Sequence, residues 1–225
     1  MSPQIKPIKI YGKTGPNPLK VTIIFKELDI PHEIVSVPFS DIKKADYVAI
    51  NPNGRLPSIH DPNTGITLWE SGAIIEYLID NYDPSHKLSF SPGSAEWYHS
   101  KQWLHYQMSG QGPYFGQVVW FTRLHAEKIP SAIERYIKEV NRVTAVLEGQ
   151  LARQKLASGS DEAWLVGNKI SFADLVFLPW HTIMGLLIPP DEYNLNNYPH
   201  VKQWLENMSS RKSVKDAMES VSLTG

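Results

Sequence analysis

The chain of 225 residues is 42% hydrophobic and 11% aromatic, which is ample for a buried core and excludes a disordered chain. Its formal net charge of −1 gives no reason to expect nucleic acid as a partner. A membrane-spanning run of about 18 apolar residues and an apolar leader are both missing, so we expect a cytoplasmic protein without membrane contact. There is no cysteine, which excludes disulfides, zinc–thiolate sites and a cysteine nucleophile.

The first part of the chain alternates strand and helix signals. Strand-like alternation gives way to helical periodicity three times, and a turn signal at Asp61–Gly65 separates two neighbouring strands. The order strand-helix-strand-helix-strand-strand-helix predicts a small α/β domain. The predicted strands are residues 5–11, 32–37, 56–60 and 66–68, and the predicted helices are residues 19–28, 40–50 and 71–82.

The rest of the chain is predicted to be helical. Prolines, serines and Gly93 mark residues 83–93 as a linker. Further on, apolar side chains recur at spacings of four and three, which predicts a helix buried on one face. That stripe consists of Ile133, Ile137, Val140, Thr144, Leu147 and Leu151. We therefore predict a domain over residues 1–84, a linker over 85–94 and an all-helical domain over 95–225.

Ser171 and Asp174 are three residues apart at the start of an apolar segment. This spacing is typical of a capping box, with aspartate in place of the usual glutamate. We expect these two residues to serve folding and not chemistry, because a capping box is a local folding signal.

Two short runs point to a ligand site. Asn51–Ile59 places Pro57 where an apolar strand begins, and Trp69–Ile74 places Glu70 and Ser71 at the start of a helix. A cis proline leaves a backbone edge free for pairing, and a helix N-terminus offers N–H groups to a carboxylate. Together they suit a small anionic peptide such as glutathione.

These runs resemble the glutathione site of the cytosolic glutathione transferases, and the resemblance extends along nearly the whole chain. Trp103–Gly110, Ala132–Tyr136 and Trp164–Lys169 resemble a fungal subgroup in particular. That subgroup contains the yeast nitrogen-catabolite regulator, a prion protein, together with its enzymatically active relatives. The resemblance implies an N-terminal thioredoxin-like domain followed by a C-terminal helical bundle, and a cytoplasmic homodimer.

The resemblance places Asn17 beside the glutathione sulfur. A free thiol has a pKa of about 8.5, so donors from Asn17 and its loop are expected to stabilise the thiolate. Taken alone, Asn17 is better explained as a helix N-cap, because asparagine is a common residue at that position. Pro18 stands where the subgroup has glycine, at the expected first position of the helix, and it removes one N–H that would face the ligand.

The same resemblance implies the other glutathione contacts. The Leu56 backbone is expected to pair with the cysteinyl residue beside a cis Pro57, and Glu70 and Ser71 are expected to bind the γ-glutamyl end. Lys43 and Arg55 are the candidates for the cation that meets the glycyl carboxylate, and a solvated charged face explains the lysine equally well.

A glycine-rich stretch carries the predicted site of the second substrate. Its glycines weaken the helix that contains them and are expected to kink it, which opens an apolar cleft between the predicted domains. The residues assigned to this cleft are Gln107, Gln111, Tyr114, Phe115 and Trp120. Aromatic contacts between domains or subunits are an equally good explanation for any one ring.

The sequence thus predicts a glutathione transferase that takes glutathione as co-substrate, without a bound cofactor or a metal. The eight histidines lack a metal-binding spacing. Three alternatives stay open. These are a glutathione-dependent disulfide reductase or peroxidase, a regulatory binding protein like the nitrogen regulator, and an enzyme dedicated to one intermediate of a fungal secondary pathway.

Overall fold

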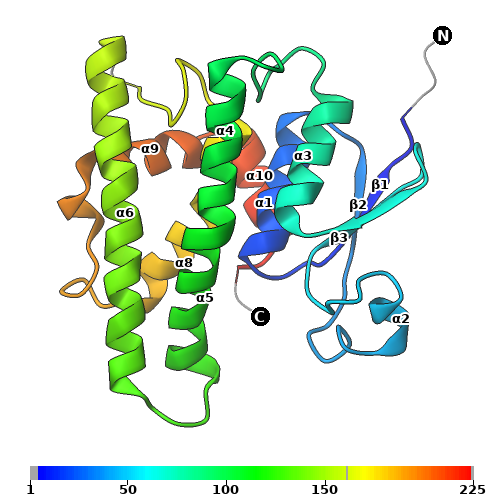
Figure 1. Cartoon of the computed structure of the whole chain (residues 1–225). Coiled ribbons are helices and arrows are strands. Elements are labelled where there is room, and N and C mark those ends of the chain that lie inside the picture. The colour runs from blue at the N-terminus through cyan, green and yellow to red at the C-terminus, as the bar shows by residue number, and fades with distance from the viewer. Residues whose placement is uncertain (1–4, 161, 224–225) are drawn as a thin grey trace. The chain divides into compact units, whose positions relative to one another are not determined.

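The computed structural model describes residues 5–160 and 162–223 (Figure 1). Its contacts divide the chain into two compact units, one made of residues 1–88 with 211–225 and the other of residues 89–210. Within the described residues, no helix combines the length and the apolar character needed to cross a membrane.

The first unit is built on a mixed sheet. Among the described residues its strands have the order β2-β1-β3-β4, with β1 parallel to β2 and antiparallel to β3, and β3 antiparallel to β4. The order along the chain is the predicted one and gives a thioredoxin-like unit. Its elements are β1 (Ile8–Tyr11), α1 (Pro16–Glu27), β2 (His32–Val35), α2 (Ala45–Val48), β3 (Ser58–Asp61), β4 (Ile66–Trp69), α3 (Ser71–Tyr82) and α10 (Lys212–Ser220).

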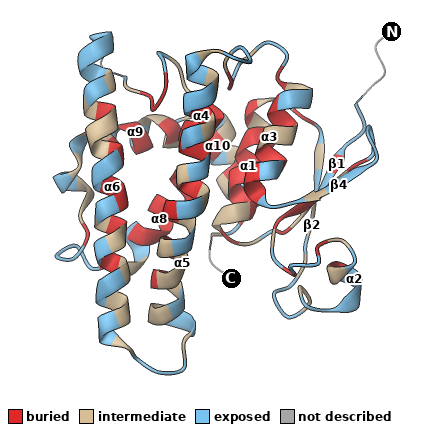
Figure 2. Ribbon diagram, in the orientation of Figure 1, coloured by how far each residue is buried: buried red, intermediate tan, exposed pale blue. Residues whose placement is uncertain are grey.

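The core of this unit lies where α1 and α3 meet each other and the sheet. Alternation places Ile8 and Ile10 of β1 in the interior and leaves Lys9 exposed. Helix α3 begins and ends where its apolar periodicity predicts, and α1 is buried over nearly its whole length (Figure 2). Burial thus holds both helices against the core of this unit.

The second unit is helical. The predicted apolar stripe lies on α6, and all of its members are buried apart from the half-buried Ile133. Helix α6 packs against α5 and α9, and α4 packs against α7. The elements of this unit are α4 (Ala95–Tyr106), η1 (Gln107–Gln111), α5 (Gly112–Val119), η2 (Trp120–Leu124), α6 (Pro130–Ser158), α7 (Phe172–Leu175), α8 (Leu178–Leu187), η3 (Leu195–Asn197) and α9 (Pro199–Ser209).

The irregularity predicted for the glycine-rich stretch takes a specific form. Helix α5 is preceded by η1 and followed by η2, and both are π-helical turns. A π-helical turn widens the helix locally and leaves backbone groups without their usual partners. The glycines are thus accommodated by a change of helix type at each end of α5.

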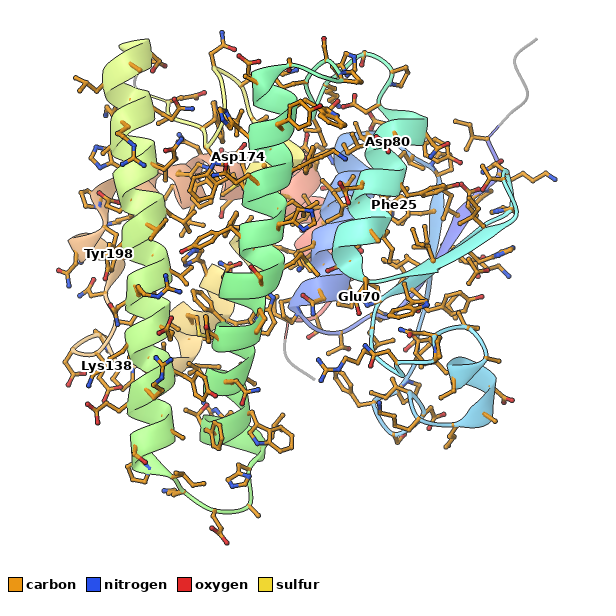
Figure 3. All side chains as sticks on the ribbon, in the orientation of Figure 1. Phe25, Glu70, Asp80, Lys138, Asp174 and Tyr198 are labelled. Carbon is orange, nitrogen blue, oxygen red and sulfur yellow. The ribbon has the colours of Figure 1, made fainter. Side chains whose placement is uncertain are left out.

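The predicted capping box is present at the start of α7, and its Asp174, labelled in Figure 3, is fully buried. Its carboxylate accepts hydrogen bonds from the main chain and hydroxyl of Ser171, from Leu165 N at 2.8 Å and from Trp204 Nε1 at 3.0 Å. Burial raises the pKa of Asp174 to about 6, although these donors stabilise its ionised form. One carboxylate therefore joins three segments of the helical unit.

Helix α10 packs against α1 and so belongs by its contacts to the first unit. The sequence assigns this helix to the all-helical domain over 95–225, because helical periodicity does not show which core a helix joins. The first unit is consequently made of two separate stretches of the chain.

Candidate functional site

Strand register brings the predicted ligand segments to one edge of the sheet. Tyr11 pairs with Ser58, and Ser58 pairs with Trp69. The residues just beyond this row are Gly12, Pro57 and Glu70. The loop into α1, the proline before β3 and the start of α3 therefore meet at the same edge.

Gly12 shows how closely these segments approach. A Cβ atom on Gly12 would lie 3.1 Å from Cγ of Pro18 and 3.2 Å from Cβ of Leu56. Gly12 also has a φ of 127°, a conformation that residues with a side chain rarely adopt. The turn between β1 and α1 is thus packed against Leu56, which brings the Asn17 loop and the predicted peptide-pairing residue together.

Asn17 lies in the first turn of α1 and is not its N-cap. The helix begins at Pro16 with Gly15 as the N-cap, earlier than both the apolar pattern from residue 19 and the expected first position at Pro18, because proline suits the first turn of a helix. Pro18 is therefore the third residue of the helix and not the first. Since Pro16 and Pro18 have no N–H, the donors that residues 16–18 can offer to an anion all belong to Asn17. Asn17 is half-buried.

The Leu56–Pro57 peptide bond is cis, as the motif predicts. Two hydrogen bonds hold the carbonyl group of Arg55, just before this peptide bond. Asn51 Nδ2 donates to Arg55 O at 2.6 Å and Tyr47 Oη donates to the same oxygen at 2.8 Å. These bonds fix the backbone just before Leu56 without using its own N–H or carbonyl oxygen.

Glu70 and Ser71 form the junction between β4 and α3. Glu70 has a φ of 71°, an uncommon conformation for a residue with a side chain and one that is concentrated at functional sites. It is exposed and lies at the N-terminus of α3 (Figure 3). Ser71 is 3% exposed and is the first residue of that helix. The pair presents a carboxylate and a helix N-terminus side by side.

The two candidate cations differ in their surroundings. Lys43 Nζ donates to Asn53 O at 2.8 Å and so is tied to the loop that carries the motif. Arg55 is exposed, and the structure shows no ion pair of its guanidinium with any described residue. Arg55 has the donors available for a carboxylate.

The residues predicted for the second substrate do not form one surface. Gln107, Gln111 and Phe115 are fully buried in the helical unit, Tyr114 is half-buried and Trp120 is 46% exposed. Gln107 Nε2 donates to Gln111 Oε1 at 2.9 Å, and Gln111 Nε2 donates to Phe177 O at 3.0 Å. The two glutamines are therefore structural partners in the core of this unit.

Sequence reasoning missed Lys20. This lysine follows Asn17 by three residues on α1 and is only 1% exposed. Burial lowers its pKa to about 7, against the opposing pull of the Glu70 carboxylate. Lysine is almost never fully buried. The burial of the neighbouring residues of α1 is what shows that Lys20 is buried as well. Lys20 places a group that titrates near neutral pH next to the site.

Replacing Lys20 with methionine should flatten the pH dependence of stability. The folded pKa of Lys20 is below its unfolded value, so between about pH 7 and pH 10 the unfolded state binds more protons and the free energy of unfolding rises with pH. We expect that rise to be about 2 kcal/mol larger in the wild type than in Lys20→Met between about pH 7 and pH 9. Urea unfolding at a series of pH values measures it. Lys9→Met, at an exposed lysine of β1, is the control and should keep the wild-type slope; an equal slope in Lys20→Met would contradict the assignment.

Comparison with known families agrees with this arrangement. Residues 14–81 match the family model described as glutathione S-transferase, N-terminal domain, and residues 113–212 match the glutathione S-transferase, C-terminal domain. The chain therefore belongs to the glutathione S-transferase family. Within that family it falls in the fungal Ure2-like subclass.

Individual relatives cover nearly the whole chain. It is 57% identical to the glutathione S-transferase-like protein tpcF of Aspergillus fumigatus, over 97% of this chain and 98% of that protein. Among solved structures, glutathione transferase URE2P6 of Phanerochaete chrysosporium, in complex with oxidized glutathione, has a TM-score of 0.87 and 40% identity, covering 97% of each chain. Ure2p in complex with glutathione has a TM-score of 0.86 and 32% identity, covering 95% of this chain and 99% of that one.

Proposed function

We propose that this protein is a glutathione transferase whose site lies at the sheet edge formed by the Asn17 loop, Leu56–Pro57 and Glu70–Ser71. The observation that carries the proposal is the convergence of these three segments, which the register of β1, β3 and β4 imposes. Each segment offers what one part of glutathione requires: a donor for the sulfur, a backbone edge for the peptide, and a carboxylate beside a helix N-terminus for the γ-glutamyl group.

The chemical task of the Asn17 loop is to stabilise the thiolate. Lowering a thiol pKa by one unit corresponds to about 1.4 kcal/mol of preferential stabilisation of the anion. The side-chain amide of Asn17 and the positive end of α1 are sufficient for this, since a hydrogen bond to a charged group contributes about 1.5–3 kcal/mol. The thiolate then attacks an electrophilic carbon, forms a carbon–sulfur bond and displaces a leaving group that departs with its electron pair.

The remaining contacts orient the tripeptide. Glu70 pairs with the γ-glutamyl ammonium, while Ser71 and the N-terminus of α3 receive the adjacent carboxylate. Leu56 pairs with the cysteinyl backbone through its main-chain N–H and carbonyl oxygen. Arg55 is the better candidate for the glycyl carboxylate, because Lys43 already donates to Asn53 O. The expected homodimer remains a prediction.

Disulfide reduction is the second candidate. The chain has no cysteine, and its relative URE2P6 was solved with oxidized glutathione. In this reaction one glutathione thiolate attacks a disulfide and expels a thiolate. A second glutathione thiolate then attacks the mixed disulfide, which releases the other thiolate of the substrate and leaves oxidised glutathione.

Calorimetric titration with reduced and with oxidised glutathione tests the proposal, together with thiolate absorbance at neutral pH. We expect the reduced form to bind with a thiolate signal, and Glu70→Gln to weaken its binding about 10-fold or more, since an ion pair with the ligand is lost. Asp80→Asn, at an exposed carboxylate farther along α3 (Figure 3), is the matched control and should bind normally. Preference for the oxidised form would favour the reductase, and no binding of either form would contradict both functions.

A further inference from the structure

The segment that follows α10 is paired with the loop that precedes Asn17. Ser222 N donates to Lys13 O at 3.0 Å, and Gly15 N donates to Ser222 O at 2.8 Å. Thr14 and Ser222 thus form an isolated parallel β-bridge. Val221, just before it, is 1% exposed and anchors the segment in the core of the first unit.

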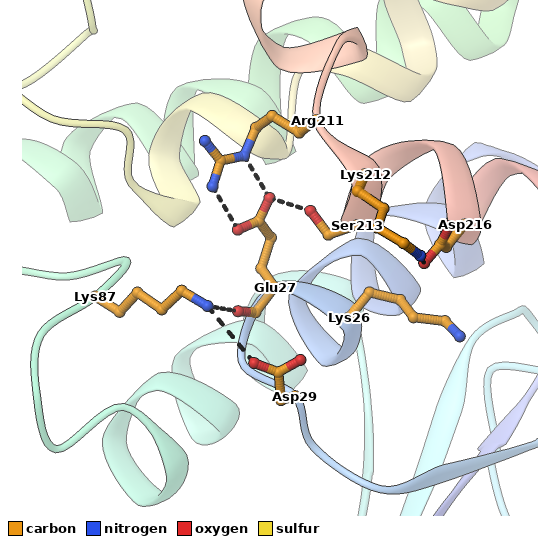
Figure 4. Close-up of a pocket in the computed structure, with 8 residues that line it drawn as sticks. All are labelled: Lys26, Glu27, Asp29, Lys87, Arg211, Lys212, Ser213 and Asp216. Carbon is orange, nitrogen blue, oxygen red and sulfur yellow. Dashed lines mark hydrogen bonds and ion pairs between the residues drawn. The ribbon is translucent and has the colours of Figure 1, made fainter.

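The other end of α10 is fixed at the far end of α1. Glu27, the last residue of α1, is 2% exposed and accepts hydrogen bonds from Arg211 Nε at 2.5 Å and Arg211 Nη2 at 2.8 Å, and one from Ser213 (Figure 4). Burial opposes ionisation of Glu27, but these donors outweigh it and lower its pKa. A buried carboxylate with a bidentate partner is costly to disrupt, so this contact holds the start of α10 firmly.

These two attachments hold residues 211–222, which include α10, along α1. We call this segment the brace. Arg211 lies beside the end of α1 and Ser222 lies beside the residues before its start, so the two helices run antiparallel. The cavity of about 690 Å³ in Figure 4 lies at the Glu27 end, one helix length from Asn17. Its charges are largely paired with one another, and we assign it a structural role.

Gly15 connects the brace to the candidate site, because it bonds to Ser222 and precedes the first residue of α1. It is the N-cap of α1, with a φ of 102°, and its carbonyl oxygen accepts the N–H of Leu19 at 3.3 Å. Glycine can adopt this φ without a steric cost but is not confined to it, and the bond from Gly15 N to Ser222 O is a contact that holds Gly15 in place. The orientation of the first turn of α1, and hence of Asn17, follows from the orientation of Gly15.

We propose that Ser222 is a positioning residue of the thiol site, which holds the Lys13–Gly15 loop so that Asn17 meets the glutathione sulfur. The inference rests on the proposed function and adds to it residues more than 200 positions away in the sequence. Because the pairing uses only main-chain groups, it leaves no side-chain motif at residue 222.

Ser222→Pro removes the N–H that Lys13 O accepts and tests the inference. We expect the thiol pKa of bound glutathione to rise by about one unit and kcat/KM near neutral pH to fall about 10-fold. KM for glutathione should change less than about 2-fold, because the contacts of Glu70 and Leu56 remain. Leu223→Pro is the matched control, since the structure gives the Leu223 N–H no bond to a described residue, and it should behave as wild type.

The outcomes separate the two proposals. A wild-type protein that leaves the thiol pKa of glutathione unchanged would overturn the proposed function and this inference together. A wild type that lowers it, with Ser222→Pro lowering it equally, would overturn the inference alone, and so would equal losses in Ser222→Pro and Leu223→Pro.

Amide hydrogen exchange on the wild type gives a second test that needs no variant to fold. The Gly15 and Ser222 amides should exchange together, because one opening event exposes both, and saturating reduced glutathione should slow both. Independent exchange of the two amides, or no response to glutathione, would overturn the inference.

Discussion

Replacing Asn17 with alanine is expected to raise the thiol pKa of bound glutathione by about 1 to 2 units and to lower the rate at neutral pH about 10- to 100-fold. Pro16 and Pro18 carry no N–H, so the first turn of α1 has few donors with which to compensate. The main-chain N–H of residue 17 and the helix N-terminus remain in the variant, which limits the loss.

A pH–rate profile with a reactive aromatic electrophile measures this effect. The rate of Asn17→Ala should approach that of the wild type at alkaline pH, where glutathione ionises without help. Asn81→Ala is the control, because Asn81 is an exposed asparagine in the last turn of α3. A profile of Asn17→Ala that coincides with that of the wild type would remove Asn17 from the mechanism.

Replacing Asp174 with alanine is expected to destabilise the protein by about 3–5 kcal/mol, or to prevent it from folding. The carboxylate accepts four hydrogen bonds, from Ser171, Leu165 and Trp204, and its removal leaves buried donors without an acceptor. The loss should be structural, so any folded fraction should retain normal affinity for glutathione.

Urea unfolding followed by circular dichroism measures the effect of Asp174→Ala. Asp191→Ala, at an exposed aspartate, serves for comparison and should change the free energy of unfolding by less than about 0.5 kcal/mol. A similar small change in Asp174→Ala would mean that water replaces the lost acceptor and that the network contributes little.

Local signals predicted much of the fold. Helix α3 was predictable to the residue because an apolar periodicity follows directly on Glu70 and Ser71, and the cis Pro57 followed from its motif. The start of α1 was predicted too late, since the alternating Pro16, Asn17 and Pro18 have no apolar periodicity. Proline nonetheless fits the first turn of a helix better than any later one.

What escaped prediction depends on contacts between distant residues. Gln107 and Gln111 were assigned to a cleft because they lie in the glycine-rich stretch that was expected to kink, and in the structure Gln107 donates to Gln111 in a buried core. A lysine in a helix is expected to be exposed, and the burial of Lys20 becomes evident only from the burial of the helix around it. The pairing of Ser222 with Lys13 and Gly15 joins main-chain groups, which leave no trace in residue type.

The two-part composition of the first unit has a consequence for synthesis. A growing chain folds from its N-terminal end as it leaves the ribosome, and residues 1–88 emerge long before α10. The sheet and its proline loop can therefore form early, whereas Gly15 lacks its Ser222 partner until residue 222 has been synthesised. On the proposed role of Ser222, a nascent chain stalled before residue 211 would have its sheet and proline loop but would lack the contact that orients Asn17, so thiol activation would follow the folding of the sheet and not accompany it.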